Sequence, residues 1–287
     1  MRTPFICHSP KQFNIPVIYS SPHSGRIYSR AFLNKTPLSF KAIRASEDFY
    51  VDQLLDSVTG SGAFLLEACF PRVFVDLNRS SHELDKKLIT DLSIDSTSPR
   101  TEVGLGVVPR VVGNGIEIYN KKLSLEEVRA RLNKYYFPYH KQLQKLINFT
   151  IETFGMAFLL DMHSMPHTCL NHLGDKKSLK PQIVLGDCFG TSCTPMFSQE
   201  VFDICNSEGF AVNLNNPFSG GFITKQYGSP MKNVHVIQIE IDRSLYMDET
   251  TVLLHEGFLE LKNKIRNIIY SIAKIKEQKK YFFQAAE

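Results

Sequence analysis

Two histidines stand directly after apolar runs of the kind that form buried strands. His23 lies in the turn SPHSG that follows Pro16–Ser20, and His163 lies in HSMP after Met156–Asp161. A lone histidine is more often a hydrogen-bonded structural residue, but here two occupy equivalent places in rigid turns. A catalytic zinc needs three protein ligands, often two histidines and a carboxylate. The pair therefore predicts a metal site held by His23 and His163.

The acidic ligand of such a site must come from another segment. Glu47, followed by Asp48, lies at the start of the helix predicted over Ser46–Ser57 (SEDFYVDQLLDS) and is our candidate. The alternative is an acid in the first turn of a helix, stabilised by the helix dipole, and composition alone does not choose between the two. Asp161 precedes His163 by two residues, so it either fixes the tautomer of that imidazole or only caps the end of the strand.

Glu240 lies between two isoleucines in the apolar run Val234–Ile241. A buried carboxylate is costly unless it has a partner or a task. Beside a metal-activated water it would act as general base and then as acid to the leaving amine. The pattern fits equally well an edge strand whose residues Gln238, Glu240 and Asp242 face solvent.

Two arginines flank a further apolar run, Arg72–Leu77, with Asn78 directly before Arg79. A guanidinium fork fits a carboxylate through two parallel hydrogen bonds, although arginines are also common on ordinary surfaces. The segment Gly104–Pro109 imitates a dinucleotide-binding loop, but its last glycine and the following helix are missing, so we expect no nucleotide cofactor.

These residues need a scaffold that brings strand ends together. Apolar runs that alternate with helical patterns predict an α/β fold with a mixed, mostly parallel sheet covered on both faces, in which ligands bind beyond the carboxyl ends of the strands. No linker or repeat interrupts the chain, so we expect a single domain over residues 1–287, with 277–287 as a frayed tail. Strands are predicted at Pro16–Ser20, Ala63–Phe70, Arg72–Leu77, Met156–Asp161, Gln182–Gly186, Phe210–Leu214 and Val234–Ile241, and helices at Ser46–Ser57, Ser124–Phe154 (kinked at Pro138), Met196–Ser207 and Thr250–Lys276.

Composition narrows the classes of protein. Of the 287 residues, 43% are hydrophobic and 22% are charged, which is typical of a globular protein and excludes a disordered chain. No run reaches the ~20 apolar residues of a membrane span, and the net charge of +4 comes without the basic runs of a nucleic-acid surface. The six cysteines are scattered and the N-terminus lacks an apolar leader segment, so we expect free thiols and a cytoplasmic protein.

Seven segments in this order resemble the N-formylglutamate amidohydrolase family: SPHSG, SEDFYVDQL, FVDLNR, GLGVVPR, DMHSMP, NPFSGGFIT and QIEIDRSLYMDE. The family is similar to zinc carboxypeptidases and aspartoacylases, which implies a phosphorylase/hydrolase-like three-layer α/β/α sandwich and metal-dependent amide hydrolysis. His23 and His163 match the metal histidines, and Glu240 matches the catalytic glutamate. Asn78 and Arg79 match the pair that holds the substrate carboxylate, and Arg72 resembles a further arginine.

One position departs from the carboxypeptidase pattern. The acidic ligand there follows the first histidine by three residues, where this chain has Arg26, so Glu47 is the substitute that we favour, with Asp48 beside it.

The resemblance implies an enzyme of histidine degradation that uses Zn2+, Co2+ or another divalent metal to convert N-formyl-L-glutamate to formate and L-glutamate. Its partner would be a small anionic substrate rather than nucleic acid or membrane, and the oligomeric state stays open. The alternatives are a metallocarboxypeptidase- or aspartoacylase-like hydrolase of another small acylated or peptidic carboxylate, and a carboxylate-binding module without catalysis. A metal-free serine hydrolase using Ser24 or Ser164 would need a G-x-S-x-G elbow, which the chain lacks.

Overall fold

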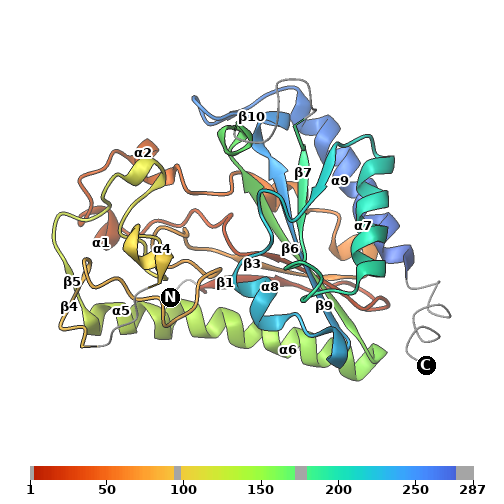
Figure 1. Ribbon diagram of the computed structural model, residues 1–287, viewed down its shortest axis with the longest axis horizontal. Helices are drawn as coiled ribbons and strands as arrows, with labels where there is room; N and C mark the ends of the chain where they lie inside the picture. The colour runs from red at the N-terminus through yellow and green to blue at the C-terminus, as the bar shows by residue number, and fades with distance from the viewer. Residues whose placement is uncertain (1–2, 94–97, 172–179, 276–287) are drawn as a thin grey trace. The chain divides into compact units, whose positions relative to one another are not determined.

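The structure is a computed structural model that describes residues 3–93, 98–171 and 180–275 (Figure 1). The chain divides into two compact units. The first comprises Met1–Ile6, Pro22–Asp48 and Glu67–Lys145, and the second comprises Cys7–Ser21, Phe49–Leu66 and Leu146–Glu287. The single domain expected from the sequence stays a prediction, and its proposed tail, residues 277–287, lies outside the described residues.

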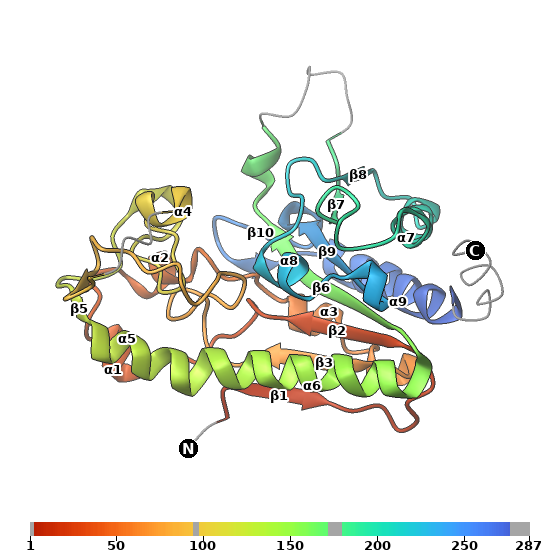
Figure 2. The ribbon, with the colours of Figure 1, turned by 60° about the horizontal axis from the view of Figure 1, so that its bottom comes forward.

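A seven-stranded sheet has the strand order β1-β3-β2-β6-β9-β7-β8. Strand β6 pairs in parallel with β2 on one side and β9 on the other, as Figure 2 shows, whereas β7 runs antiparallel to β9 and parallel to β8. The mixed, mostly parallel sheet predicted from the apolar runs is confirmed. Its strands are β1 (Phe5–His8), β2 (Val17–Ser21), β3 (Phe64–Ala68), β6 (Ala157–Met165), β7 (Ile183–Gly186), β8 (Val212–Leu214) and β9 (Val234–Asp242).

The two central strands, β6 and β9, are buried along their whole length. Because successive side chains of a strand point to opposite faces, each strand presents one set of residues to each side of the sheet. On one side the set is apolar, with Leu160 and Ile239 among its members in the main hydrophobic cluster. On the other side the set includes four polar residues, namely Asp161, His163, Gln238 and Glu240.

Helices cover both faces of this sheet. The apolar face packs against α3 (Val51–Leu54), α7 (Pro195–Ser207) and α9 (Gly257–Lys274), the last two of which lie side by side in Figure 1. Leu261, Ile265, Ile268 and Ile272 recur at helical spacing in α9 and form its buried stripe. Helix α8 (Phe222–Tyr227) packs against β9 on the polar face, where Gly221 N–H donates to Gln238 Oε1. The predicted three-layer α/β/α arrangement is confirmed.

The first unit is built from short elements and turns. Serine side chains cap four of its helices by accepting a backbone N–H in the first turn. A π-helical turn at Leu132–Tyr136 joins α5 (Leu125–Arg131) to α6 (Phe137–Phe154). It ends two residues before Pro138, the residue at which the sequence predicts a kink. The elements are α1 (Arg30–Leu33), α2 (Phe40–Arg44), β4 (Ile89–Thr90), α4 (Pro99–Glu102), β5 (Leu123–Ser124), α5 (Leu125–Arg131) and the first half of α6 (Phe137–Phe154); the second unit adds β10 (Met247–Asp248) and β11 (Leu253–Leu254).

Three predicted elements differ from the structure. The helix predicted over Thr250–Lys276 begins at Gly257, because Leu253–Leu254 form β11 and pair antiparallel with β10. Arg72–Leu77 forms turns instead of a strand, because Asp76 N–H bonds to Val107 O outside any ladder. Val73, Val75 and Leu77 are still buried. The helix predicted over Ser46–Ser57 is shortened to Val51–Leu54. Tyr50 adopts a left-handed conformation with φ of 61°, which separates Glu47 and Asp48 from the helix that follows.

None of the six cysteines, all of which lie within the described residues, forms a disulfide, which agrees with the expectation from their scattered positions. Among the described residues, no helix combines the length and the apolar character that crossing a membrane requires.

The core of the second unit yields a stability test. Phe197 is fully buried and stacks on Phe158 at 4.1 Å between ring centroids. We expect Phe197→Ala to lower the free energy of unfolding by about 3 to 5 kcal/mol, because it removes buried area and leaves a cavity. Phe189→Ala, at a side chain that is 76% exposed, is the matched control and should change it by less than ~0.5 kcal/mol. Equal losses in urea unfolding would contradict this description of the core.

Candidate active site

His23 is held in a tight turn two residues after β2. Its side chain is 1% exposed, and its Nε2 atom lies 2.8 Å from Asp76 Oδ1. Gly25 explains why the turn lies so close to the neighbouring chain: a Cβ at this position would lie 2.3 Å from the carbonyl oxygen of Phe70. Only glycine allows that approach, so the SPHSG motif has a steric as well as a chemical role.

Asp76 is a central residue of the site that the sequence analysis did not single out. Its carboxylate binds His23, accepts a hydrogen bond of 2.9 Å from the backbone N–H of Asn78, and forms an ion pair of 2.8 Å with Arg72. Burial by itself would raise the pKa of Asp76, but Arg72, His23 and Arg79 together hold it well below its usual range. Asp76 is therefore ionised, and it fits the role of orienting His23.

The two acids of the SED segment have different partners. Glu47 Oε1 accepts hydrogen bonds from Tyr28 at 2.6 Å and from Arg44 at 2.9 Å, and Arg44 also binds Glu47 Oε2. Asp48 lies next to the histidine instead: its N–H bonds to His23 O, and its Oδ2 atom lies 3.6 Å from His23 Nδ1. The acid that the sequence favoured is thus engaged with Tyr28 and Arg44, and its neighbour stands beside His23.

His163 lies within β6 and is 2% exposed, so the turn predicted for it is wrong: the strand continues to Met165. Its Nε2 atom is 2.8 Å from Asp161 Oδ2, and Ser20 of β2 donates to the other oxygen of Asp161 at 2.9 Å. The parallel register pairs Ser20 with Asp161, so all three side chains point to the same face of the sheet. Asp161 has the position that the sequence analysis expected of a residue fixing the tautomer of His163.

Glu240 occupies a central strand and not an edge. Strand β9 lies between β6 and β7, and its register pairs Glu240 with His163, so the two side chains share one face. The edge-strand alternative of the sequence analysis is wrong, because Glu240 is only 9% exposed. The side-chain amide of Gln238 donates to Glu240 Oε1 at 2.8 Å and fixes the orientation of the carboxylate.

His23, Asp48 and His163 form a group that could hold a metal ion. Each offers one ligand atom, and these atoms lie within 4.8 Å of one another. Both histidines bind a carboxylate through Nε2, which leaves Nδ1 as the other ring nitrogen, and metal-ligating histidines commonly have such a partner. Two imidazoles and one carboxylate are a ligand set that suits a catalytic zinc. The residues therefore fit a divalent metal, with Asp48 rather than Glu47 as the acid.

The predicted substrate-binding residues have distinct surroundings. Arg72 pairs with Asp76 and lies 3.8 Å from Asp48, so its charge is balanced by carboxylates of the site itself. Arg79 donates to the backbone carbonyls of Leu105 and Asn78 and, within the described part of the chain, forms no ion pair. Burial lowers the pKa of Arg79, and Asp76 partly restores it. Its charge makes Arg79 the better of the two arginines for an anionic ligand.

Two further residues on the polar face were not predicted. Gln238 links helix α8 to Glu240, because its side chain accepts from Gly221 N–H and donates to the carboxylate. Tyr227, the last residue of α8, has a pKa raised by burial and by the charge of Asp161, so its hydroxyl stays protonated. The signal for Gln238 is its two-residue spacing from Glu240 in a strand, whereas nothing local in the sequence indicates Tyr227.

Comparisons with known proteins agree with one another. A model of the N-formylglutamate amidohydrolase family matches residues 15–247. The chain is 31% identical over 242 residues to the N-formylglutamate deformylase of Pseudomonas putida, covering 83% of this chain and 84% of that protein. It is 31% identical over 267 residues to the N-formylglutamate deformylase of Pseudomonas aeruginosa, covering 91% of this chain and 94% of that one.

Solved structures are similar over nearly the whole chain. The crystal structure of N-formylglutamate amidohydrolase from Ralstonia eutropha JMP134 superposes with a TM-score of 0.90 at 32% identity, covering 96% of this chain and 99% of that chain. A gene product of Agrobacterium tumefaciens superposes with a TM-score of 0.64 at 14% identity, covering 96% of this chain and 97% of that one. At that identity, the second likeness shows a shared fold only.

The two acids of the SED segment can be distinguished by metal binding. If His23, Asp48 and His163 hold a divalent metal, we expect Asp48→Asn to weaken Zn2+ binding by at least ~100-fold, because it removes one of the three candidate ligands. Glu47→Gln, one residue away, should keep the affinity within ~3-fold, since the Glu47 carboxylate is bonded to Tyr28 and Arg44. Competition with a chromogenic chelator measures both. The assignment fails if Glu47→Gln loses the metal and Asp48→Asn retains it.

Proposed function

Because this chain belongs to the N-formylglutamate amidohydrolase family, we propose that it hydrolyses N-formyl-L-glutamate to formate and L-glutamate with a bound divalent metal, foremost Zn2+. It is a hydrolase that acts on an amide C–N bond. The observation that carries the metal dependence is the buried group of His23, Asp48 and His163, with Glu240 in register beside His163. A role in histidine degradation and a cytoplasmic location stay predictions.

The proposed division of labour follows from the contacts. A metal held by His23, Asp48 and His163 would supply Lewis-acid polarisation of the formyl carbonyl and would acidify the attacking water. Glu240 takes the proton of that water and afterwards delivers it to the departing amine of glutamate. Gln238 holds Oε1 of Glu240 in place during both transfers. Asp76 and Asp161 keep the two imidazoles in the tautomer that leaves Nδ1 for coordination.

Anion recognition is assigned mainly to Arg79. Its guanidinium is anchored by two backbone carbonyls, and a fork of donors of this kind fits a carboxylate. Asn78 lies beside it, and its backbone is fixed by Asp76. Arg72 balances the charges of Asp76 and Asp48, and it adds positive electrostatic potential for a dianionic substrate.

Formate release tests the substrate and the metal together. Metal-loaded enzyme should release formate from N-formyl-L-glutamate at least ~10-fold faster than from N-formyl-L-glutamine, which keeps the shape but lacks the side-chain charge. EDTA should abolish the reaction, and Zn2+ or Co2+ should restore it. N-acetyl-L-glutamate is the matched control for the acyl group. Full activity in chelator, in protein without stoichiometric metal, would exclude the proposal.

The role of Glu240 has a separate test. Glu240→Gln keeps the size and the Gln238 contact but cannot take a proton, so we expect kcat to fall by about 10² to 10⁴ while the bound metal per chain is unchanged. Glu260→Gln, on the outer surface of α9, should leave kcat unaltered. Unchanged turnover in Glu240→Gln would mean that another group is the base, or that the chain binds carboxylates without this chemistry.

A further inference from the structure

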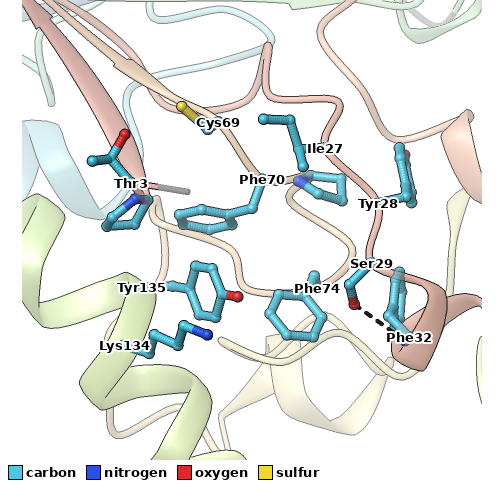
Figure 3. A pocket seen from close by; sticks show the side chains of 12 residues that line it. Thr3, Ile27, Tyr28, Ser29, Phe32, Cys69, Phe70, Phe74, Lys134 and Tyr135 are labelled. Carbon is cyan, nitrogen blue, oxygen red and sulfur yellow. Dashed lines mark hydrogen bonds between the residues drawn. The ribbon is translucent and has the colours of Figure 1, made fainter. Parts of the chain in front are cut away.

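The first unit contains a cavity that the proposed reaction does not use. Its volume is about 340 Å³, and it is lined by the segments around Tyr28, Phe74 and Tyr135, as Figure 3 shows. None of the metal-group residues or Arg79 lines it. Drug-sized ligands occupy sites of roughly 300 to 1,000 Å³ with mainly apolar walls and a few polar groups. The cavity therefore has the size and character of a site for a small ligand.

The walls of the cavity favour a flat, aromatic ligand. Tyr135 meets Phe70 and Phe74 edge-on, with ring centroids 5.0 and 5.2 Å away and interplanar angles of 68° and 88°. Phe32 meets Phe74 in the same way at 5.2 Å. Rings held edge-to-face leave free edges and faces on which a further ring can pack, and such contacts contribute about 0.5 to 1.5 kcal/mol each beyond area burial.

The charges around the cavity indicate whether its ligand is a cation or an anion. Aromatic walls often bind cations, but here one face of Phe74 and one face of Tyr135 already carry a cation of the chain. The Arg131 guanidinium lies 4.4 Å from the ring centroid of Phe74, and the Lys134 ammonium lies 5.4 Å from that of Tyr135. Lys134 is the one charged residue among the described lining residues, and it forms no ion pair within the described ranges. A second cation would be repelled, whereas an anion would be attracted.

Hydrogen-bond donors for an anion are present at the same place. The hydroxyl of Tyr135 points into the space between Phe70 and Phe74 (Figure 3). Ser29 accepts the N–H of Phe32 at its Oγ, so its own proton can be donated to a guest. Lys134 adds up to three N–H donors. A carboxylate is an acceptor that all of these groups can bind.

We propose that this cavity is a second ligand site, separate from the reaction centre, that binds a small aromatic monocarboxylate. The ring packs among Phe70, Phe74 and Tyr135, and the carboxylate is held by Lys134 with the two hydroxyls. Tyr28 connects the cavity to the metal group through a hydrogen bond, because its hydroxyl donates to Glu47, the residue before Asp48. The proposal does not depend on which amide the enzyme hydrolyses.

Titration with 2-naphthoate tests the site in the full-length, metal-loaded protein. The chain contains no tryptophan, so the fluorescence anisotropy of the naphthoate can be followed without that background. We expect saturable binding of one molecule per chain. Neutral 2-naphthamide should bind about tenfold more weakly, and cationic 2-naphthylmethylamine more weakly still. Tighter binding of the amine would overturn the proposal in favour of a cation cage.

Two lysine variants locate the binding. Lys134→Gln removes the charge at the cavity and should weaken 2-naphthoate binding about tenfold. Lys141→Gln, at an exposed lysine of α6 outside the lining, is the matched control and should have no effect. Equal affinities of the two variants would overturn the proposal.

Competition separates this site from the reaction centre. Saturating N-formyl-L-glutamate should leave 2-naphthoate bound, and displacement would show that the naphthoate occupies the catalytic site instead. Formate release is measured in the same samples, so failure of the second site and failure of the proposed reaction give different results. Ile27→Phe, at an exposed lining residue, should weaken 2-naphthoate binding by filling part of the cavity, and it keeps the chain free of tryptophan. A thermal melt verifies that the variant folds.

Discussion

Each candidate metal histidine is bound to a carboxylate that is almost completely withdrawn from water. Asp161 has no exposed surface and Asp76 has 3%. Burying a carboxylate costs several kcal/mol unless hydrogen bonds and opposite charge compensate for it. Ser20 and His163 supply this for Asp161, and Arg72, His23 and the Asn78 N–H supply it for Asp76. The partners of Asp161 come together only in the observed β2–β6 register, and those of Asp76 only in the observed turns of Arg72–Asn78. The requirement to compensate these two buried charges therefore constrains the backbone of both segments.

The strands could be predicted from the sequence, because they follow from the periodicity of apolar residues. The partners of individual side chains could not, because they depend on the backbone conformation of the turns that carry them. The apolar runs located β2, β6, β7 and β9, and the polar residues at their ends indicated His23, His163 and Glu240. The choice between Glu47 and Asp48 depends on Tyr50 in its left-handed conformation and on Tyr28 and Arg44, which no spacing rule connects. Asp76 was overlooked because Arg72–Leu77 was predicted to be a strand. Its apolar residues satisfy burial equally well in consecutive turns.

The arginines illustrate how charge pairing refines a motif. Both were predicted to bind a carboxylate on the strength of their residue type. In the folded chain Arg72 balances Asp76 and Asp48, and without it both buried carboxylates would lose the cation that they share. Arg79 is held by backbone carbonyls, which orient the guanidinium without neutralising it. A family motif therefore identified the right segment, while the neighbouring acids decide what each arginine can do.

The position of Asp76 between His23 and Asn78 has a thermodynamic consequence. One carboxylate orients an imidazole of the metal group and also fixes the backbone that carries Arg79. In the proposed enzyme, metal binding and substrate binding are therefore linked equilibria: a metal that orders His23 also orders the anion-binding segment through Asp76. By reciprocity, the substrate strengthens the retention of the metal by the same factor. At equilibrium, molecules with bound substrate would then hold a scarce metal more firmly than molecules without it.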